Sequence, residues 1–379
     1  MSQRFLIVGG GMIGLTAALG LRLQGHRVTL FERGAAPAFG EATELRVSAI
    51  AHHSRTLLQQ LEVWQALPEE RIGPYQAMEV WDHDSFGQIQ FHASEVNQDD
   101  LGAIVENKVL EAALWQQAQR AGVELLAQTE VSGHVISDDQ VTLTTASGDY
   151  VGDYLIAADG THSPLRQAAG LPLTFWDYQQ QGCVAVVRCS KSHDGYARQV
   201  FLPTGPVAWL PLADPHQVSI VWSADNHHAE QLKALSDVDF SKQLQAASDG
   251  ALGQLEVMSE RAYFPLRMQY AQRWLQQRLL LLGDAAHSIH PLAGQGANLG
   301  FGDVEALLEI TASTFGQRQL RNWERERKVA ALQMIATMEA FKRGFGNDQP
   351  AFKLLRGAGL RLVNKVAPLK RALIKSALG

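Results

Sequence analysis

The sequence predicts an α/β protein in which a mostly parallel sheet carries an inserted antiparallel sheet and is followed by helices. Short continuous apolar runs, typical of strands buried on both faces of a parallel sheet, stand at 5–8, 154–158 and 279–282. Each run leads into a glycine-containing turn and then a helical pattern. Between 179 and 264, β-branched or alternating segments recur about every 10 residues between prolines and glycines, which indicates an antiparallel sheet.

The composition limits the class of protein. The chain has 379 residues, of which 46% are apolar and 19% charged, so it can bury a sizeable core and is not a disordered chain. At about 150 residues per domain, it has room for two domains or slightly more. Its net charge of −6 argues against nucleic acid as a partner. The only two cysteines, Cys183 and Cys189, make no disulfide framework, and no Cys/His group has zinc-ligand spacing, which together favour a reduced, cytoplasmic compartment.

Residues 5–21 carry no charge, and their 17 residues approach the roughly 18 that would suggest a membrane-spanning helix. The stretch contains four glycines and lacks both a basic leader and a cleavage-type ending. We therefore expect it to be core and neither a signal peptide nor an anchor.

Within this stretch, the glycine pattern Gly9-x-Gly11-x-x-Gly14 lies between the first predicted strand and a helix. Gly9 permits a tight turn, Gly11 lets a pyrophosphate approach the backbone, and Gly14 allows close packing of helix on strand. The positive end of the helix dipole then faces the phosphates. The pattern predicts a dinucleotide site; the alternative is a glycine-rich turn that serves helix packing alone.

A second strand at 28–31 ends in Glu32, 18 residues after Gly14, close to the spacing of about 20 at which an acid binds a ribose diol. The neighbouring Arg33 fits either a 2′-phosphate or a solvated loop, of which we favour the loop. Glycine spacing alone does not distinguish FAD from NAD.

A second motif follows the apolar run at 154–158. Ser163 suits a helix N-cap and Pro164 the first helical position, so a helix should begin there. This leaves Asp159-Gly160 in the crevice between strand and helix, where ligands bind in open α/β sheets. An ordinary Asp-Gly turn is the alternative.

A third motif follows the apolar run at 279–282. Gly283-Asp284 ends that strand, and a glycine-rich loop that includes Gly294, Gly296, Ala297 and Asn298 opens another helix. Asp284 can accept a hydrogen bond from a ribityl hydroxyl. The exposed N–H groups of the helix would suit the negative charge of a reduced flavin ring.

In this order, the three motifs and the following Pro291 resemble the FAD-dependent aromatic hydroxylases of the para-hydroxybenzoate hydroxylase fold. Within them, the chain resembles the UbiH/UbiF/VisC family of ubiquinone-biosynthesis hydroxylases, through residues 46–50, 105–107 and 283–302. It is most similar to the VisC-like (UbiI) branch, which hydroxylates C5 of a 2-polyprenylphenol, through 78–87, 173–178 and 197–201.

The resemblance implies three regions. A discontinuous Rossmann-like FAD-binding domain should comprise 1–72, 98–178 and 265–320. A substrate domain, the inserted antiparallel sheet, should comprise 73–97 and 179–264. A C-terminal helical region, 321–379, should end in a basic amphipathic tail.

The family chemistry implies that reduced flavin reacts with O2 to give a C4a-hydroperoxide, whose distal oxygen attacks a phenol ring. NAD(P)H or another reductant is the electron source, and the chain shows no second nucleotide fingerprint that would hold it. The implied FAD contacts are Ile13 and Glu32 at the adenosine half, Arg46 and Asn107 near the pyrophosphate and ribityl chain, backbone of Val131 at the adenine, Asp284 on the ribityl chain, and backbone of Ala297 and Asn298 at the ring. Pro291 and His290 should lie near the ring, and Asn107 stands where many relatives carry arginine.

The tail differs in charge from the rest of the chain. No acid follows Asp348, and seven basic residues there contribute +7, so the remainder carries −13. They are interleaved with apolar residues, a pattern of helices that lie on anionic membranes; the seven are Lys353, Arg356, Arg361, Lys365, Lys370, Arg371 and Lys375. Docking on a membrane or on a ubiquinone-biosynthesis partner is one interpretation, and packing on the enzyme itself is the other.

Other functions remain open from the sequence. His287 and His290 have a possible metal-ligand spacing, but no third ligand is near in the sequence, so we expect no metal. Alternatives to hydroxylation of a hydrophobic polyprenyl phenol are a sister hydroxylase for another ring position, a flavin-bearing scaffold subunit, and an NAD-only dehydrogenase.

Overall fold

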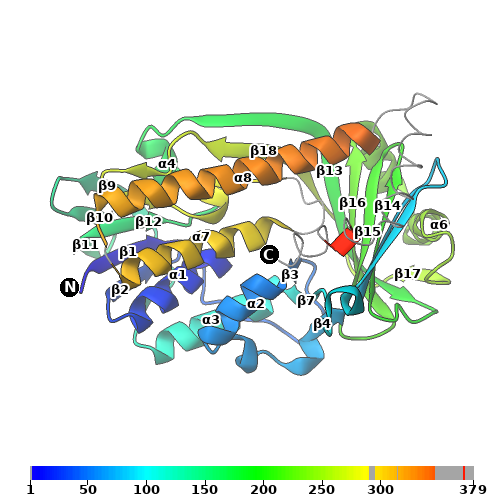
Figure 1. Cartoon of the computed structure of the whole chain (residues 1–379), viewed down its shortest axis with the longest axis horizontal. Coiled ribbons are helices and arrows are strands. Elements are labelled where there is room, and N and C mark those ends of the chain that lie inside the picture. The colour runs from blue at the N-terminus through cyan, green and yellow to red at the C-terminus, as the bar shows by residue number, and fades with distance from the viewer. Residues whose placement is uncertain (1, 290–294, 314, 346–369, 372–379) are drawn as a thin grey trace.

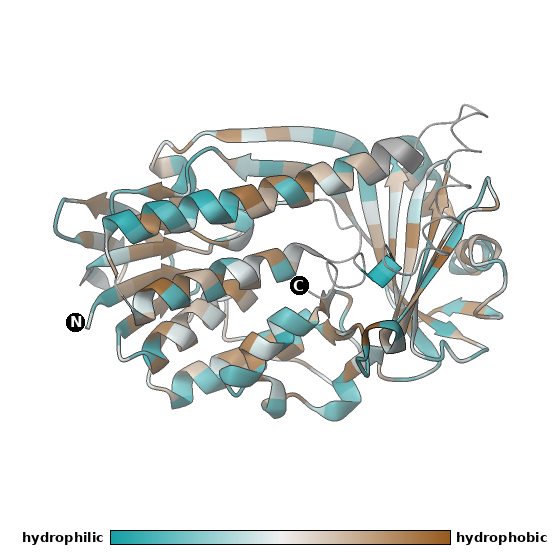
Figure 2. Cartoon of the chain, viewed as in Figure 1, coloured by the Kyte–Doolittle hydropathy of each residue, from teal (hydrophilic) through white to brown (hydrophobic). Residues whose placement is uncertain are grey.

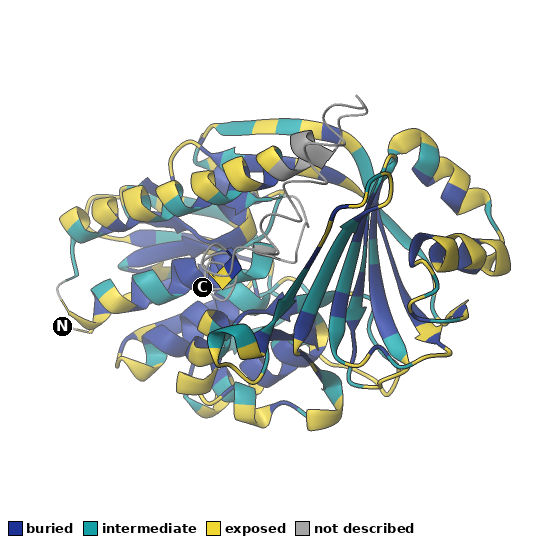
Figure 3. Ribbon diagram, turned by 45° about the vertical axis from the view of Figure 1, so that its right-hand side comes forward, coloured by how far each residue is buried: buried dark blue, intermediate teal, exposed yellow. Residues whose placement is uncertain are grey.

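The computed structural model describes residues 2–289, 295–313, 315–345 and 370–371, except for the side chains of Gln295 and 341–345. Two sheets stand at opposite ends of the molecule (Figure 1), and the long helix α8 (Gln317–Phe345) runs from one toward the other. Figure 3 shows that the strands of the first sheet are mostly buried, that the strands of the second combine buried and intermediate residues, and that the outward turns of the helices are exposed.

The first sheet has six strands, and its central strands are parallel, as the apolar runs predict. The predicted strands at 5–8, 28–31, 154–158 and 279–282 are confirmed within a residue of their ends. In spatial order the strands are β19 (Leu275–Gln276), β20 (Leu279–Leu281), β12 (Tyr154–Ala157), β1 (Arg4–Val8), β2 (Arg27–Phe31) and β8 (Glu124–Leu126). Figure 2 shows their hydrophobic character.

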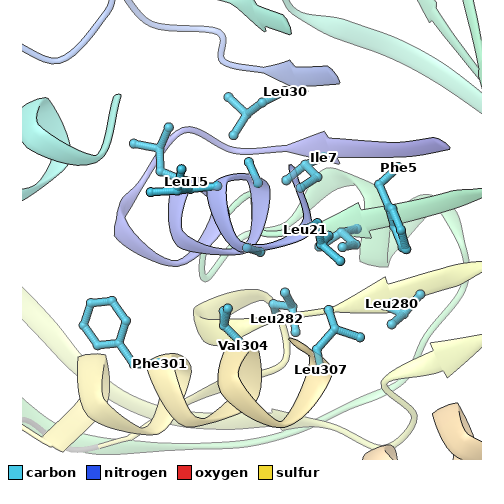
Figure 4. Close-up of a cluster of buried hydrophobic side chains, with 14 of the residues drawn as sticks. Phe5, Ile7, Leu15, Leu21, Leu30, Leu280, Leu282, Phe301, Val304 and Leu307 are labelled. Carbon is cyan, nitrogen blue, oxygen red and sulfur yellow. The ribbon is translucent and has the colours of Figure 1, made fainter. Parts of the chain in front are cut away.

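Helices α1 (Met12–Leu23), α3 (Asn107–Arg120) and α7 (Gln295–Ala312) pack beside this sheet. The uncharged stretch 5–21 is core, as expected: Phe5, Ile7 and Leu15 are fully buried. Figure 4 shows Phe301, Val304 and Leu307 of α7 directed toward α1. The core therefore joins the first and third sequence motifs.

The second sheet has nine strands and holds the region 179–264 together with the hairpin at 77–92. In spatial order they are β21 (His287–Ser288), β18 (Ala262–Ala271), β13 (Leu173–Cys189), β16 (Gln217–Asp225), β15 (Gly205–Pro211), β14 (Tyr196–Leu202), β5 (Ala77–Asp82) and β6 (Gln88–His92), with β17 (Leu255–Val257) also on β13. Helices α5 (Asn226–Ala234) and α6 (Asp237–Ala247) cover one face of this sheet.

The pairings within 179–264 are antiparallel, as predicted, whereas β14 pairs in parallel with β5 of the hairpin at 77–92. The direction of β5 is set by β4 (Ile72–Tyr75), which ends two residues earlier and is already paired in another sheet. The long strands β13 and β18 also run through the predicted domain boundaries at 178/179 and 264/265. The division into domains stays a prediction.

Two three-stranded sheets complete the strands of the described residues. One contains β3 (Val47–Ile50), β7 (Gly102–Glu106) and β4, and the other contains β9 (Val131–Ile136), β10 (Val141–Thr145) and β11 (Gly148–Gly152). The remaining short helices are α2 (His52–Gln60), α4 (Pro164–Ala168), η1 (Trp64–Ala66), η2 (Glu69–Arg71), η3 (Ala93–Val96) and η4 (Gly283–Ala285).

Most of the predicted basic tail lies outside the described residues. Lys370 is described: it is buried, and its ammonium group lies 2.7 Å from the Glu95 carboxylate of η3. At this residue the tail packs on the protein. None of the helices that the structure describes combines the length and apolar character needed to cross a membrane.

Gly73 in β4 offers a test of how the two sheets are held together. A β-carbon there would overlap the carbonyl oxygen of Pro211 and backbone of Leu212, beyond the end of β15. We expect Gly73→Ala to lower stability by about 1–3 kcal/mol, because backbone atoms cannot move aside cheaply. Thermal and urea unfolding measure this. In the control Gly133→Ala, a β-carbon meets nothing within 4 Å, so an equal loss in the two variants would contradict the explanation.

Candidate functional site

The turn between β1 and α1 brings backbone into close contact. Gly9 has a φ of +113°, which disfavours other residues, and a β-carbon at Gly14 would overlap the Gly9 carbonyl oxygen. Gly11 is the N-cap of α1, no side chain caps it, and the first turn of α1 holds no acid. This helix end, with its positive dipole and no acid of its own in the first turn, suits an anion.

Glu32 lies at the end of β2, beside this turn. Its carboxylate accepts hydrogen bonds of 2.6 Å from the backbone N–H groups of both Gly10 and Gly34. The segment that leads to Val131 is adjacent, because the Thr129 N–H donates to the Glu32 carbonyl oxygen at 2.9 Å. Arg33 is exposed. The structure therefore brings Glu32 and the start of β9 to the same end of the sheet.

Ile13 joins the first motif to the third. Its side chain lies between Gly283 and Gly300, where added β-carbons would come within 3.1 Å and 2.8 Å of it. Asp284 follows Gly283 in the sequence. The residue is exposed to solvent, although many protein atoms lie around its carboxyl group. Burial raises the pKa of the Asp284 carboxyl, while His287, Arg46 and a hydrogen bond from Thr161 act in the opposite direction.

Asp159 begins the second motif. Its carboxylate accepts from the Leu165 N–H at 3.2 Å, while its other oxygen, Oδ1, is buried with no hydrogen-bond partner. Burial raises the pKa of this carboxyl. Gly160 follows with a φ of +84°. The buried Arg166 donates to the carbonyl oxygens of Ala285, at 2.8 Å, and Thr161, at 3.0 Å. Arg166 thus ties the second motif to the third.

Gly296, Ala297 and Asn298 occupy the first turn of α7, where backbone N–H groups have no partner within the helix. The Asn298 side chain is used structurally, since its amide donates to the Ala49 carbonyl at 2.8 Å and its oxygen accepts from the Ala51 N–H at 3.0 Å. A ligand could therefore use the backbone of this turn. His290, Pro291 and Gly294 lie outside the described residues.

Arg46 and Asn107 meet where β3 begins and β7 ends. The Asn107 N–H donates to the Arg46 carbonyl at 2.9 Å, and the Asn107 side chain accepts from Ser48 at 2.8 Å. The Arg46 residue is exposed. The position of Arg46, which influences the pKa of Asp284, suits a group that binds phosphate or the adjoining chain.

A network of charged side chains in the protein interior holds the Gly283-Asp284 motif in place. Asp303 of α7 is fully buried, accepts from His287 Nε2 at 2.6 Å, and accepts from Arg327 Nε of α8 at 2.8 Å. The Gly283 N–H also donates to Asp303 at 3.3 Å. Arg327 further donates to the Leu299 carbonyl at 3.1 Å. This network fixes α7, α8 and the Gly283-Asp284 turn relative to one another.

An apolar cavity of ≈ 100 Å³ lies between the β3–β7–β4 sheet and the uncovered face of the nine-stranded sheet. Its side chains are mainly apolar: Val47, Ala49, Tyr75, Met78, Ile104, Ala208, Leu210 and Val221, with Gln199 and Ser223 as polar members.

Arg198 borders the cavity, but its guanidinium group belongs to the other face of the sheet. Its Nε lies 3.4 Å from the Glu79 carboxylate, its Nη1 donates to the His193 carbonyl, and its guanidinium lies over the Tyr196 ring. Within the described lining, no other residue carries a charge.

The polar groups at the ends of β1, β2 and β12 fit a dinucleotide: an uncapped helix end, the Glu32 carboxylate and the unpartnered buried Oδ1 of Asp159. A family model described as "FAD binding domain" matches residues 3–338 of the chain. The chain is 35% identical to a "3-demethoxyubiquinol 3-hydroxylase" of Escherichia coli (strain K12), over 98% of this chain and 97% of that protein. It is 34% identical to "Ubiquinone biosynthesis monooxygenase COQ6, mitochondrial" of Danio rerio, over 98% of this chain and 89% of that protein.

The chain belongs to the family of FAD-dependent ubiquinone-biosynthesis monooxygenases. A solved structure, p-nitrophenol 4-monooxygenase PnpA from Pseudomonas putida DLL-E4, shares its fold, with a TM-score of 0.80 at 19% identity over 100% of this chain and 98% of that one. The expected α/β fold, FAD as cofactor and the monooxygenase family are thereby confirmed. The VisC-like branch is not distinguished, because similar relatives carry several different names.

Sequence reasoning missed four residues of this monooxygenase site. Thr161 lies 3.4 Å from the Asp284 carboxylate. Arg166 and Asp303 are buried and form hydrogen bonds with Ala285 and His287 of the third motif. Glu111 of α3 faces the N-terminus of α1. A charged residue on the apolar face of a predicted helix is a signal that could have revealed these residues. Their partners, however, are distant in the sequence.

Asp303 is expected to stabilise the fold as well as the site. Removing its carboxylate in Asp303→Ala leaves Arg327 and His287 buried without their partner, which should cost about 3–5 kcal/mol of unfolding free energy. Urea unfolding measures this, and the FAD content of the purified protein should fall in parallel. Asp239→Ala, which breaks an exposed pair with Lys242, should change stability little. Wild-type stability in Asp303→Ala would contradict this role.

Proposed function

We propose that this monooxygenase hydroxylates the ring of a polyprenyl phenol in ubiquinone biosynthesis, at C5, with FAD, O2 and NAD(P)H or another reductant. The observation that carries the proposal is the cavity between the two sheets. A cavity of ≈ 100 Å³ is comparable with the roughly 150 Å³ that accommodates benzene in another protein. We infer that a single ring occupies it and that a long substituent extends out of it.

The lining of the cavity favours, as substrate, a phenol that carries no carboxylate group. A benzoate would bring an ionised carboxylate, which needs a buried cation. The one cation of the described lining, Arg198, already faces Glu79 and the Tyr196 ring on the opposite side of the sheet. Gln199 and Ser223 can hydrogen-bond neutral ring oxygens.

When bound, FAD supplies the redox chemistry by which O2 is activated. The residues of the chain would bind and orient it: Glu32 would accept at the adenosine half, Asp284 at the ribityl chain, and the first turn of α7 would offer N–H groups to the ring. The apolar cavity walls exclude water from the bound phenol. These assignments follow the places of the residues at the strand ends.

A second candidate is hydroxylation at another ring carbon. The identity of 35% to a protein named 3-demethoxyubiquinol 3-hydroxylase favours it, since the two chains match over nearly their whole lengths. The cavity fits both candidates, because they differ only in which carbon of the same ring faces the flavin.

We also infer a cytoplasmic protein that contacts other ubiquinone-biosynthesis proteins or the inner face of the membrane peripherally. The support is the hydrophobic substrate and the basic sequence of 353–375. The apolar residues next to Lys370 and Arg371 in this segment of the sequence lie outside the described residues.

The reaction is tested with purified holoenzyme, a polyprenyl phenol, NADH or a chemical reductant, and 18O2. We expect one 18O atom in the ring, at C5, located by mass spectrometry and NMR. Label at another carbon would overturn the C5 assignment and support the second candidate. Peroxide release without ring labelling at saturating phenol would contradict hydroxylation and support the scaffold alternative.

The cavity is tested by Ala208→Leu. The added atoms occupy space that a ring would need, so we expect kcat/KM for the phenol to fall about tenfold or more, corresponding to roughly 1.4 kcal/mol. Peroxide formed per reductant consumed should rise, while bound FAD stays at the wild-type level. In the control Ala66→Leu, the new side chain lies on the exposed surface of η1. Unchanged kinetics in Ala208→Leu would place the substrate elsewhere.

A further inference from the structure

A carboxyl group lies where a diphosphate must approach. Glu111 projects from α3 toward the start of α1, and a β-carbon on Gly11 would lie 3.8 Å from Glu111 Oε1. Gly11 is the glycine at which a pyrophosphate approaches the backbone. The first turn of α1 holds no acid of its own, so Glu111 supplies a carboxyl from a neighbouring helix.

The surroundings of Glu111 oppose its charge. The side chain is partly buried between α3 and α1, and this burial is the largest influence in raising its pKa to about 7. Glu32, from the end of β2, acts in the same direction. Arg46, the Met12 N–H and Lys108 favour the charged form, and Lys108 also pairs with Glu44 at 3.0 Å. Glu111 is therefore divided between its two forms near neutral pH.

A bound diphosphate changes this balance. Its two negative charges repel a carboxylate at the same helix end and compete with it for the Met12 N–H and for Arg46. A neutral carboxylic acid has an O–H that can donate to a phosphate oxygen, whereas the carboxylate can only accept. The protonated form is thus favoured in the complex.

We propose that FAD binding is coupled to the uptake of one proton by Glu111, which faces the bound diphosphate as a neutral carboxylic acid. The proton comes from solvent, and no electron is transferred. The inference rests on FAD binding alone, so it can fail while the hydroxylase proposal holds, and the reverse.

FAD affinity should fall as the pH rises above the pKa of Glu111. Below about pH 7, Glu111 is already protonated in the free protein, so FAD affinity should be independent of pH. Above pH 7, each binding event must take up a proton, and affinity should fall by up to tenfold per pH unit. The fall stops where pH exceeds the higher pKa of Glu111 in the complex.

The test measures the Kd for FAD between pH 6 and 8.5, from the fluorescence of flavin released when holoenzyme is diluted. Calorimetry of FAD binding to reconstitutable apoprotein, in two buffers of different ionisation enthalpy, counts the protons taken up. At pH 8 we expect the wild type to take up nearly one proton. Glu111→Gln should take up none, and its Kd should be independent of pH.

Two further variants complete the design. Glu256→Gln removes an exposed acid from β17, far from the nucleotide end, and should keep the wild-type proton count. Arg46→Met removes a cation that favours charged Glu111, so the pH at which affinity begins to fall should move upward, whatever the change in Kd. Arg46→Met keeps the proposal testable if Glu111→Gln does not fold.

The outcomes are decisive in both directions. Wild-type proton uptake retained in Glu111→Gln would overturn the proposal, as would a wild-type Kd that does not change with pH. An unshifted onset in Arg46→Met would also count against it. Loss of uptake in Glu111→Gln alone, together with an upward shift in Arg46→Met, would support it.

Discussion

Close packing at glycines is the constraint on which the nucleotide end of this monooxygenase depends. Gly9 and Gly14 let α1 start directly against β1 and β12, and Gly283 and Gly300 leave room for Ile13. Side chains at these glycines would separate the three strand ends that carry Glu32, Asp159 and Asp284. Glu32, Asp159 and Asp284, which are 125 to 252 residues apart in the sequence, therefore form one site only because backbone can meet backbone there.

The same end of the molecule is joined to the nine-stranded sheet by a buried charge. Asp303 binds Arg327 and thereby fixes the start of α8 against α7. Farther along α8, Ile335 packs with Met268 of β18, and Met338 packs with Phe201 of β14. A carboxylate so deeply buried is costly unless it is fully paired. Its pairing thus sets the direction of a helix that contacts both sheets.

The glycine motifs and apolar runs predict the parallel sheet, its helices and the dinucleotide site because these depend on local patterns. Strand β5 shows the limit, because its parallel pairing with β14 is dictated by β4 and not by its own sequence. Glu111 and Arg166 show the same limit for the site. Each looks like an ordinary helix residue, and its role depends on a distant partner: Gly11 lies 100 residues before Glu111, and Ala285 lies 119 residues after Arg166.

The nine-stranded sheet illustrates how one strand can serve two purposes. In β15, Val207 and Trp209 face the core under α5 and α6, whereas Ala208 and Leu210 face the cavity. The large side chains on the first face pack against α5 and α6. The smaller side chains on the second face leave space beside β3 and β7. Because side chains alternate along a strand, shifting β15 by one residue would put Trp209 into the cavity. The register of this sheet therefore determines both its stability and the size of the cavity.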